Sequence, residues 1–436
     1  MRAWFFVGSF ALAAAAAAAC AATGDDPEAQ PEVDSGTGLP PVAEGGAEVQ
    51  EAGTPDQPPP KPETCSQAGW CITALPDADL LMRDIQVLPG RAFAIAESPT
   101  LGVKVLEWVD AESKWTYVDD GTQNEDGRGR WVGRLWAPNE NEIYFGVAPN
   151  YIFHGTRTAP GAAFSWDKQR IGTNNPADPD DGNLNYWKRT STRAPSLGVW
   201  GTSSGDVYAW FKDTIYRRAS VDGGAPEWVP DYTASDKDVA TEQFYFFAAA
   251  GTSPDEVWFA GARSRVNSAC VILLRRTAGA YERITDGTAG SLNQACKTRA
   301  GSLLMGGAEG WLTDLEVVST NQLVGLKGAR DVVKISVDRT ADPDAGAYSF
   351  AYVPIPSMLA GSPVNSLSAV AGDVWIGGVG VVVKGESDVW DGGKFELSTM
   401  VMNGAPLNRP IYQVRGTSNS NLWAIGVRNA LHKSIH

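Results

Sequence analysis

The 436-residue chain has few of the residues on which acid–base catalysis most often depends. It contains three histidines, and two of them, His432 and His436, fall within the last five residues. There is no HExxH sequence and no glycine-rich phosphate-binding loop. Because histidine is the commonest general acid and base near neutral pH, this scarcity argues against histidine-dependent catalysis. We expect His154 to face solvent or a strand edge rather than to act as a base.

Basic residues are also scarce, and they never form a run of five or more. The net charge is −15, from 51 acidic and 36 basic residues. Ten of the acidic residues but only one lysine lie in residues 21–64. Nucleic-acid binding needs a basic face opposite the phosphates, so this composition predicts no nucleic-acid partner.

The one long apolar run is confined to the N-terminus. Residues 1–19 contain one arginine, then an apolar stretch and small residues, a pattern typical of a secretory signal peptide and too short for a stable membrane span. The sequence Ala17-Ala18-Ala19-Cys20 resembles a bacterial lipobox, with alanine in place of the usual leucine at its start. The resemblance implies that Cys20 is lipidated. The alternative is ordinary cleavage after an Ala-x-Ala site, which would release a soluble secreted protein.

Residues 20–64 have almost no aromatic or large aliphatic side chains and are rich in Pro, Gly, Ala and Glu. Such a segment cannot bury enough apolar surface to offset the entropy of ordering it, which predicts disorder. The expected organisation is therefore a signal peptide at 1–19, a lipidated cysteine and acidic tether at 20–64, and a folded domain at 65–436.

A short phrase recurs throughout that domain. It reads LWAPNENEIYFG at 135–146, VWGTSSGDVYAW at 199–210, AAGTSPDEVWFAG at 249–261, VAGDVWIGG at 370–378 and VRGTSNSNLWAIG at 414–426, with weaker copies at 84–96 and 297–307. Each copy is an apolar strand, a polar turn and a strand with an aromatic residue. Further turns and apolar runs follow, and some units close on an aromatic: Trp115, Trp166, Trp228, Tyr281 and Phe395. One unit is therefore expected to be four antiparallel strands.

The spacing of the copies predicts a β-propeller. The residues taken as equivalent are Val87, Leu135, Val199, Ala249, Ala300, Val370 and Val414, which lie 44 to 70 residues apart. Four-stranded units at periods near 40–50 residues are propeller blades, which gives an all-β fold of about seven blades. The two longest steps imply insertions around 171–195 and 325–350. The alternative is a pair of β-sandwich domains, which would not explain an aromatic at the same place in successive units.

The ends of the domain predict how the ring closes. The last unit stops after its third strand, whereas residues 68–76 read as an isolated strand with Trp70 in the aromatic position. We therefore expect this N-terminal strand to complete the blade that begins at Tyr412, which would remove two sheet edges.

These phrases, together with the leading CSxxGWC, resemble the tryptophan-rich repeats of secreted bacterial propeller lipoproteins. The resemblance covers residues 65–436 and implies a fold rather than an activity. Two stretches, 220–228 and 387–395, are distantly similar to the Asp-box of sialidase-like (BNR) propellers. Both depart from its pattern, and in that family the box is a structural turn.

Four cysteines remain beyond Cys20, and an even number in an exported domain predicts disulfides. Sequence proximity favours Cys65–Cys71, which would hold the closing strand, and Cys270–Cys296, which would link adjacent blades. Zinc is disfavoured because no CxxC occurs.

Carboxylates beside glycine in the two insertions are the candidate metal ligands. Oxygen atoms could surround Ca²⁺ in two stretches, PADPDDGN at 176–183 and TADPDAG at 341–347. Asp342 and Asp344 are the predicted calcium ligands. An ordinary solvated turn is the alternative, and otherwise no cofactor is expected.

The sequence therefore favours a non-catalytic propeller that binds or scaffolds a protein or glycan at the cell envelope. It would touch the membrane, expected to be a bacterial outer membrane, only through its lipid anchor. The two insertions are the expected contact surface, and no catalytic residue is identified. The alternative is a glycoside hydrolase-like or lyase-like enzyme acting on envelope or extracellular polysaccharide, which would need two carboxylates about 5–9.5 Å apart across the channel.

Overall fold

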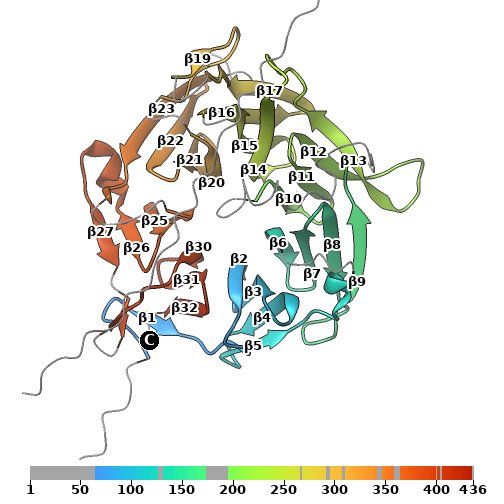
Figure 1. Ribbon diagram of the computed structural model, residues 1–436, viewed down its shortest axis with the longest axis vertical. Helices are drawn as coiled ribbons and strands as arrows, with labels where there is room; N and C mark the ends of the chain where they lie inside the picture. The colour runs from blue at the N-terminus through green and yellow to red at the C-terminus, as the bar shows by residue number, and fades with distance from the viewer. Residues whose placement is uncertain are drawn as a thin grey trace, which may run out of the picture. The chain divides into compact units, whose positions relative to one another are not determined.

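Seven four-stranded antiparallel sheets follow one another around a central axis in the computed structural model (Figure 1). The structure describes residues 64–125, 131–172, 195–265, 268–290, 295–306, 310–340, 346–357, 364–398, 400–402 and 405–434. Within these ranges the only helices are the short 3₁₀ turns η1 (Thr122–Asn124) and η2 (Ser387–Asp391). The predicted all-β propeller of seven blades is confirmed.

The first four blades each use four strands that are consecutive in sequence. Blade 1 contains β2 (Leu81–Leu88), β3 (Arg91–Ser98), β4 (Gly102–Val109) and β5 (Lys114–Tyr117). Blade 2 contains β6 (Val132–Asn139), β7 (Glu142–Val147), β8 (Tyr151–Thr156) and β9 (Ser165–Arg170). Blade 3 contains β10 (Leu197–Ser203), β11 (Asp206–Phe211), β12 (Thr214–Ser220) and β13 (Pro226–Thr233). Blade 4 contains β14 (Glu242–Ser253), β15 (Glu256–Arg265), β16 (Ser268–Thr277) and β17 (Ala280–Thr285).

Two small hairpins lie beside the remaining blades, one between blades 4 and 5 and the other between blades 6 and 7. Blade 5 contains β20 (Leu312–Ser319), β21 (Gln322–Lys327), β22 (Asp331–Asp338) and β23 (Ala347–Pro354). Blade 6 contains β24 (Ser366–Val370), β25 (Asp373–Gly377), β26 (Val382–Gly385) and β27 (Phe395–Ser398). Blade 7 contains β30 (Ile411–Ser418), β31 (Asn421–Gly426), β32 (Asn429–Ser434) and β1 (Trp70–Ile72). The hairpins are β18 (Gly287–Thr288) with β19 (Lys297–Thr298), and β28 (Val401–Met402) with β29 (Ala405–Pro406).

The hydrophobic core lies between neighbouring blades. Second strands such as β3 are buried along most of their length, whereas the outer strand β13 is largely exposed. Most apolar clusters draw on two adjacent blades, as when Ile85 of blade 1 joins Trp423 and Ile425 of blade 7. Because a sheet face is buried only by the next sheet, each blade depends on its neighbours.

One aromatic residue on each outer strand joins its blade to the preceding one. Seven residues occupy this position: Trp70, Trp115, Trp166, Trp228, Tyr281, Tyr348 and Phe395. Trp115, for example, lies 5.1 Å from Trp423 between ring centroids, and Tyr281 lies 4.9 Å from Tyr232. The aromatic residues that close the units therefore pack between blades, as the sequence predicts.

The sequence misplaces the fifth unit. Residues 297–307, read as a weak copy of the phrase, contain β19 of a small hairpin, and Ala300 is not in an inner strand. The inner strand of blade 5 is β20, in which Asp314 and Glu316 alternate with apolar residues because this strand borders the central channel. The extra length therefore lies between β17 and β20, and not at 325–350, which contains the whole of β22 and half each of β21 and β23.

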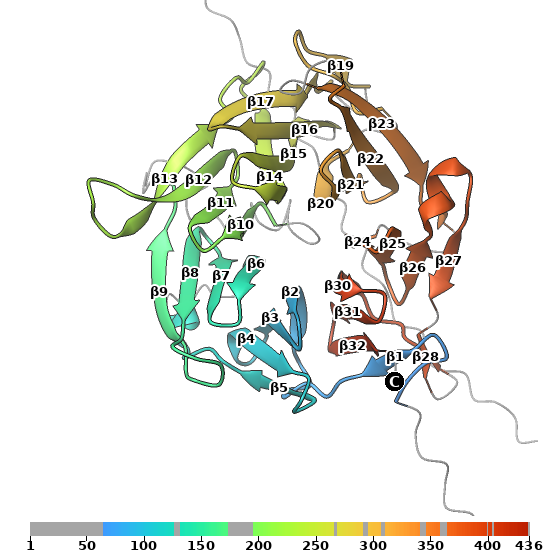
Figure 2. The same ribbon diagram turned by 180° about the vertical axis from the view of Figure 1, so that it is seen from behind.

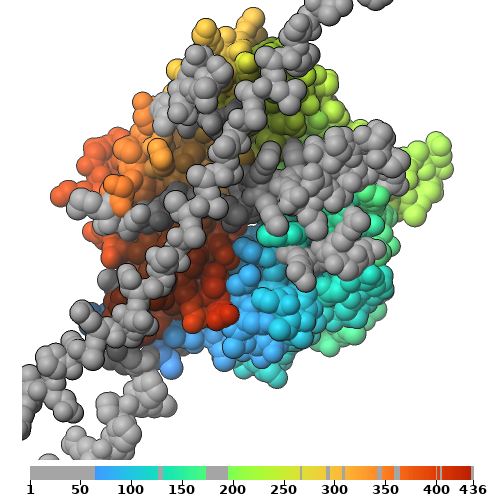
Figure 3. Space-filling view, viewed as in Figure 1, coloured from blue at the N-terminus to red at the C-terminus, as the bar shows by residue number. Residues whose placement is uncertain are grey.

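The ring closes through its N-terminal strand, as expected. β1 pairs antiparallel with β32, with Trp70 opposite Lys433 and Ile72 opposite Leu431. Trp70 is fully buried, and its Nε1–H donates to Ser398 Oγ of blade 6 over 2.8 Å. The earliest and the latest described strands therefore lie side by side (Figure 2), and in the space-filling view the blue N-terminal part of the ring adjoins the red C-terminal part (Figure 3).

Both cysteine pairs favoured by the sequence lie at bonding distance. The sulfur atoms are 2.11 Å apart in Cys65–Cys71 and 2.08 Å apart in Cys270–Cys296. The first pair flanks the start of β1. The second joins β16 to the segment before β19, so it holds the connection between blades 4 and 5 and does not link the two blades directly.

Candidate functional site

Five blades share a three-residue contact that explains the D-V-W part of the repeated phrase. An acid or amide begins the second strand, an aromatic follows two residues later, and a basic residue on the third strand lies directly across from that aromatic. The side chains pair as Glu142–His154 (3.1 Å), Asp206–Arg217 (3.5 Å), Glu256–Arg275 (3.2 Å), Asp373–Lys384 (3.2 Å) and Asn421–His432 (2.9 Å). The polar residues of the repeat therefore join strands within a blade.

His154 belongs to one of these contacts. Its imidazole stacks on Tyr144 with ring centroids 4.2 Å apart, and Glu142 accepts a bond from the Tyr144 hydroxyl over 2.6 Å. Because β8 lies between β7 and β9, His154 is not at a free strand edge, and its side chain is only 17% exposed. The expectation of a solvent-facing or edge position is wrong, since cross-strand pairing brings an acid and a ring to this histidine.

Replacing Glu142 with glutamine is expected to remove a pH-dependent part of the stability. Burial alone would raise the pKa of Glu142, but hydrogen bonds from His154, Ser204 and Tyr144 lower it to about 2. An acid whose pKa is lower in the folded than in the unfolded protein stabilises the fold at pH values above the unfolded-state pKa. This stabilisation is lost as the pH falls toward 2. We expect E142Q to cost about 1–2 kcal/mol at pH 6, after discounting for solvent, and much less near pH 2.5. Urea unfolding of both proteins at the two pH values measures this, and an equal cost at both would contradict it.

The innermost strands carry two tiers of side chains that share a face, because same-face residues alternate along a strand. The first tier consists of Asp84, Arg134, Gly198, Ala248, Asp314, Ser366 and Gln413. The second tier, two residues further on, consists of Gln86, Trp136, Trp200, Ala250, Glu316, Ser368 and Arg415. Most tier residues are polar on blades 1, 2, 5, 6 and 7, but small or aromatic on blades 3 and 4.

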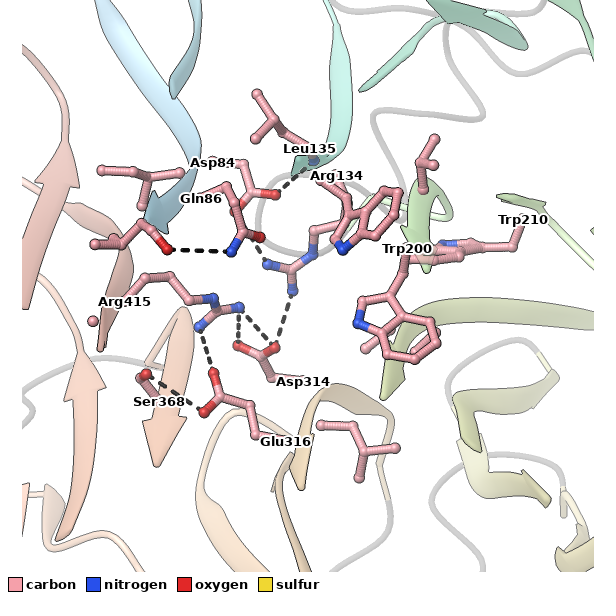
Figure 4. Close-up of a pocket in the computed structure, with 18 residues that line it drawn as sticks. Asp84, Gln86, Arg134, Leu135, Trp200, Trp210, Asp314, Glu316, Ser368 and Arg415 are labelled. Atoms are coloured by element: carbon pink, nitrogen blue, oxygen red, sulfur yellow. Dashed lines mark hydrogen bonds and ion pairs between the residues drawn. The ribbon is translucent and has the colours of Figure 1, made fainter. Parts of the chain in front are cut away.

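A cavity of about 220 Å³ lies in the channel, and all seven innermost strands line it. Ala248 lines the cavity together with Trp200, whereas the space next to Gly198 is filled by the Trp210 indole and Arg134. Figure 4 shows the indoles of Trp200 and Trp210 on one side, and the guanidinium groups of Arg134 and Arg415 facing the carboxylates on the other. The cavity therefore has an apolar wall and a charged wall.

Asp314 is the centre of the charged wall. Its carboxylate accepts two bonds from Arg415 Nη2, at 2.9 and 3.0 Å, and lies 3.5 Å from Arg134 Nη2. It also accepts the backbone N–H of Leu367 over 3.0 Å. These contacts join blade 5 to blades 2, 6 and 7.

Asp84 and Glu316 extend the same network. Asp84 lies 3.7 Å from Arg134 Nη1 and accepts the backbone N–H of Leu135 over 2.8 Å. Glu316 lies 3.6 Å from Arg415 and accepts the backbone N–H of Ala369 over 2.6 Å. Two arginines therefore face three carboxylates.

Burial perturbs these acids. Loss of solvent raises the pKa of Glu316 to about 7, with Asp314 adding to the rise and Arg415 opposing it. Burial also raises the pKa of Asp84, against the attraction of Arg134 and Arg415. Burial therefore makes the charged form of both acids less favourable than it is in water.

Donors in the cavity remain without acceptors. Arg134 is 6% exposed, and its Nε and Nη1 make no hydrogen bond; the same is true of Nε1 of Trp210, which is 1% exposed. Buried donors normally have a partner. These N–H groups are enclosed by neighbouring side chains and have almost no accessible surface, so the donors that an entering ligand can reach are those of the partly exposed Gln86 and Arg415.

The other sequence-predicted sites do not meet here. Cys20 and the calcium candidates Asp342 and Asp344 lie outside the described residues, as do PADPDDGN and nearly all of 171–195. In the part of the chain that the structure describes, no group of three His, Cys, Asp or Glu side chains is arranged to hold a metal ion. No helix there is long and apolar enough to span a membrane.

The stretch Gly201–Gly205 matches the GxSxG spacing of serine hydrolases. In that motif the serine sits on a sharp turn from a strand into a helix. Here Ser203 ends β10 and lies exposed in a hairpin turn to β11. The match therefore reflects the repeated turn sequence and not a nucleophile.

The channel and its blades place the chain in the class of seven-bladed β-propellers. No protein-family model matches the sequence, and no curated protein matches it. Similar solved structures include YCF48 from Cyanidioschyzon merolae, with a TM-score of 0.52 and 11% identity, covering 84% of this chain and 98% of that one. The Cps50 (Swd1) β-propeller domain from Myceliophteria thermophila is similar at a TM-score of 0.52 and 11% identity, covering 84% and 99%. At these identities the likeness shows the fold alone.

Proposed function

We propose that this protein is a non-catalytic binding and scaffolding propeller of the cell envelope, with an envelope protein or glycan as its partner. The channel carries the proposal. Its three carboxylates, Asp84, Asp314 and Glu316, are each held by an arginine and a backbone N–H. A nucleophile or base held in this way is poorly placed to react, whereas the open cavity beside it suits a ligand.

The location rests on the N-terminal sequence. A signal peptide, a lipobox-like Cys20 and a Pro- and Glu-rich segment together favour a propeller tethered to the membrane by lipid. Secretion as a soluble protein remains the alternative.

An enzyme acting on polysaccharide is the second candidate, and one observation favours it. Glu316, with a pKa of about 7, has the value expected of a general acid near neutral pH. Against it, the carboxylates share two arginines, and no pair is left facing across open space.

Purification of the whole protein from crosslinked envelopes tests the proposal. A partner recovered in stoichiometric amount, identified by mass spectrometry or sugar analysis, is expected. Cys20→Ser should move the protein to a soluble extracytoplasmic fraction without abolishing binding to the purified partner. Failure to recover any partner, together with turnover of envelope polysaccharide that E316Q abolishes, would contradict a non-catalytic role.

A further inference from the structure

The cavity in the channel is built to hold a small, polar ligand that has an apolar face. Its volume of about 220 Å³ corresponds to about seven water molecules, so it suits a single ring and not a folded segment. Trp200 and Trp136 line it beside Val199 and Ala249. A flat indole at the edge of a polar site buries the apolar side of a ligand and fixes its orientation.

The hydrogen-bonding groups of the cavity are mixed, which narrows the chemistry of the ligand. Gln86 and Arg415 line the cavity with partly exposed side chains that carry N–H donors. The carboxylates of Asp314 and Glu316 line the same space and can only accept when ionised. A hydroxyl group can do both, since it donates one hydrogen and accepts through its lone pairs.

The charges argue for a neutral ligand. Three carboxylates and two guanidinium groups surround the space. An anion would be repelled by Asp84, Asp314 and Glu316, and a cation would be repelled by Arg134 and Arg415, so binding of either ion carries an electrostatic penalty. A neutral compound with several hydroxyls avoids both penalties.

We propose that the channel cavity binds one ring of a neutral glycan. The C–H face of the ring packs on the Trp200 indole, while its hydroxyls accept from Gln86 and Arg415 and donate to Asp314 and Glu316. This inference rests on the proposed binding function and names its ligand class and its site.

Titration of the whole protein with neutral sugars tests the inference. The probes are glucose, galactose, mannose and N-acetylglucosamine with their disaccharides, followed by calorimetry and tryptophan fluorescence. At least one is expected to bind. Trp200→Ala should weaken binding at least tenfold, whereas Trp228→Ala, a matched loss of a half-buried tryptophan on the outer strand β13, should leave binding unchanged. Ala248→Leu fills the cavity without touching the ion network, so it should also abolish binding. This variant provides the test if Trp200→Ala fails to fold.

The outcomes separate this inference from the proposed function. If no neutral sugar binds but envelopes yield a protein partner, the sugar site is wrong and the binding function stands. Tighter binding of glucuronate or inorganic phosphate than of any neutral sugar also overturns the inference. Binding followed by hydrolysis would instead overturn the non-catalytic role.

Discussion

Deleting residues 65–76 is expected to lower the free energy of unfolding more than any single substitution. The deletion removes β1, leaves β32 as an unpaired edge and empties the position of the fully buried Trp70. Replacing Trp70 alone with alanine should cost about 3–5 kcal/mol, as for other large aromatics in a core. The deletion should cost more, because it also opens the ring and exposes a strand edge.

Urea unfolding followed by tryptophan fluorescence and circular dichroism measures both changes. Trp228→Ala is the matched comparison and should cost less than Trp70→Ala, about 1–2 kcal/mol, because Trp228 is only half buried. An unchanged unfolding midpoint after the deletion would show that blade 7 is stable without its N-terminal strand, and that the ring does not depend on this closure.

Replacing Asp314 with alanine is expected to have the second largest effect, about 3–5 kcal/mol. The Asp314 side chain is 4% exposed and contacts both Arg134 and Arg415. Without it, two guanidinium groups remain in the channel with fewer carboxylates than they need, and the N–H of Leu367 loses its acceptor. A buried charge left unpaired costs more than the intact pair contributes.

A double-mutant cycle makes this prediction specific. The double variant Asp314→Ala/Arg415→Met should cost less than the sum of the two single changes. Each single change leaves the partner's charge unpaired, whereas the double change removes both charges. Glu227→Ala, on the exposed part of β13, should stay within about 0.5 kcal/mol of the parent. Additive costs in the cycle would mean that the pair is not coupled.

Sequence periodicity was sufficient to locate a blade wherever the unit keeps both its polar turn and its aromatic residue. The phrases at 199–210 and 414–426 each fall on the first two strands of a blade. Trp70 could be assigned to the last blade because a propeller needs its fourth strand and the C-terminus lacks one. These inferences depend only on local turn chemistry and on counting strands.

The fifth blade was misread for a physical reason. Its inner strand carries Asp314 and Glu316 where an apolar pattern was sought, while the glycine-rich stretch before it imitates the phrase. Charged residues are tolerated in that strand only because arginines from other blades lie opposite them, and no local pattern reports that. The outer aromatic Tyr348 was overlooked with it.

The candidate site was likewise hidden in the sequence. Arg134, Asp314 and Arg415 lie far apart along the chain, and each alone reads as an ordinary polar residue of a strand. The sequence instead pointed to Asp342 and Asp344, because carboxylates beside glycine form a local pattern that can be seen without a fold.

By itself, the sequence indicated the all-β class, a ring of about seven blades, the closing strand and the aromatic contacts between blades, since each follows from short-range alternation and repetition. Only the tertiary structure decided which polar residues meet. Closing the ring brings seven distant strands to one axis, where they enclose a cavity and charged side chains from four blades pair with one another. Convergence of this kind depends on the curvature of the whole ring, which no single unit encodes.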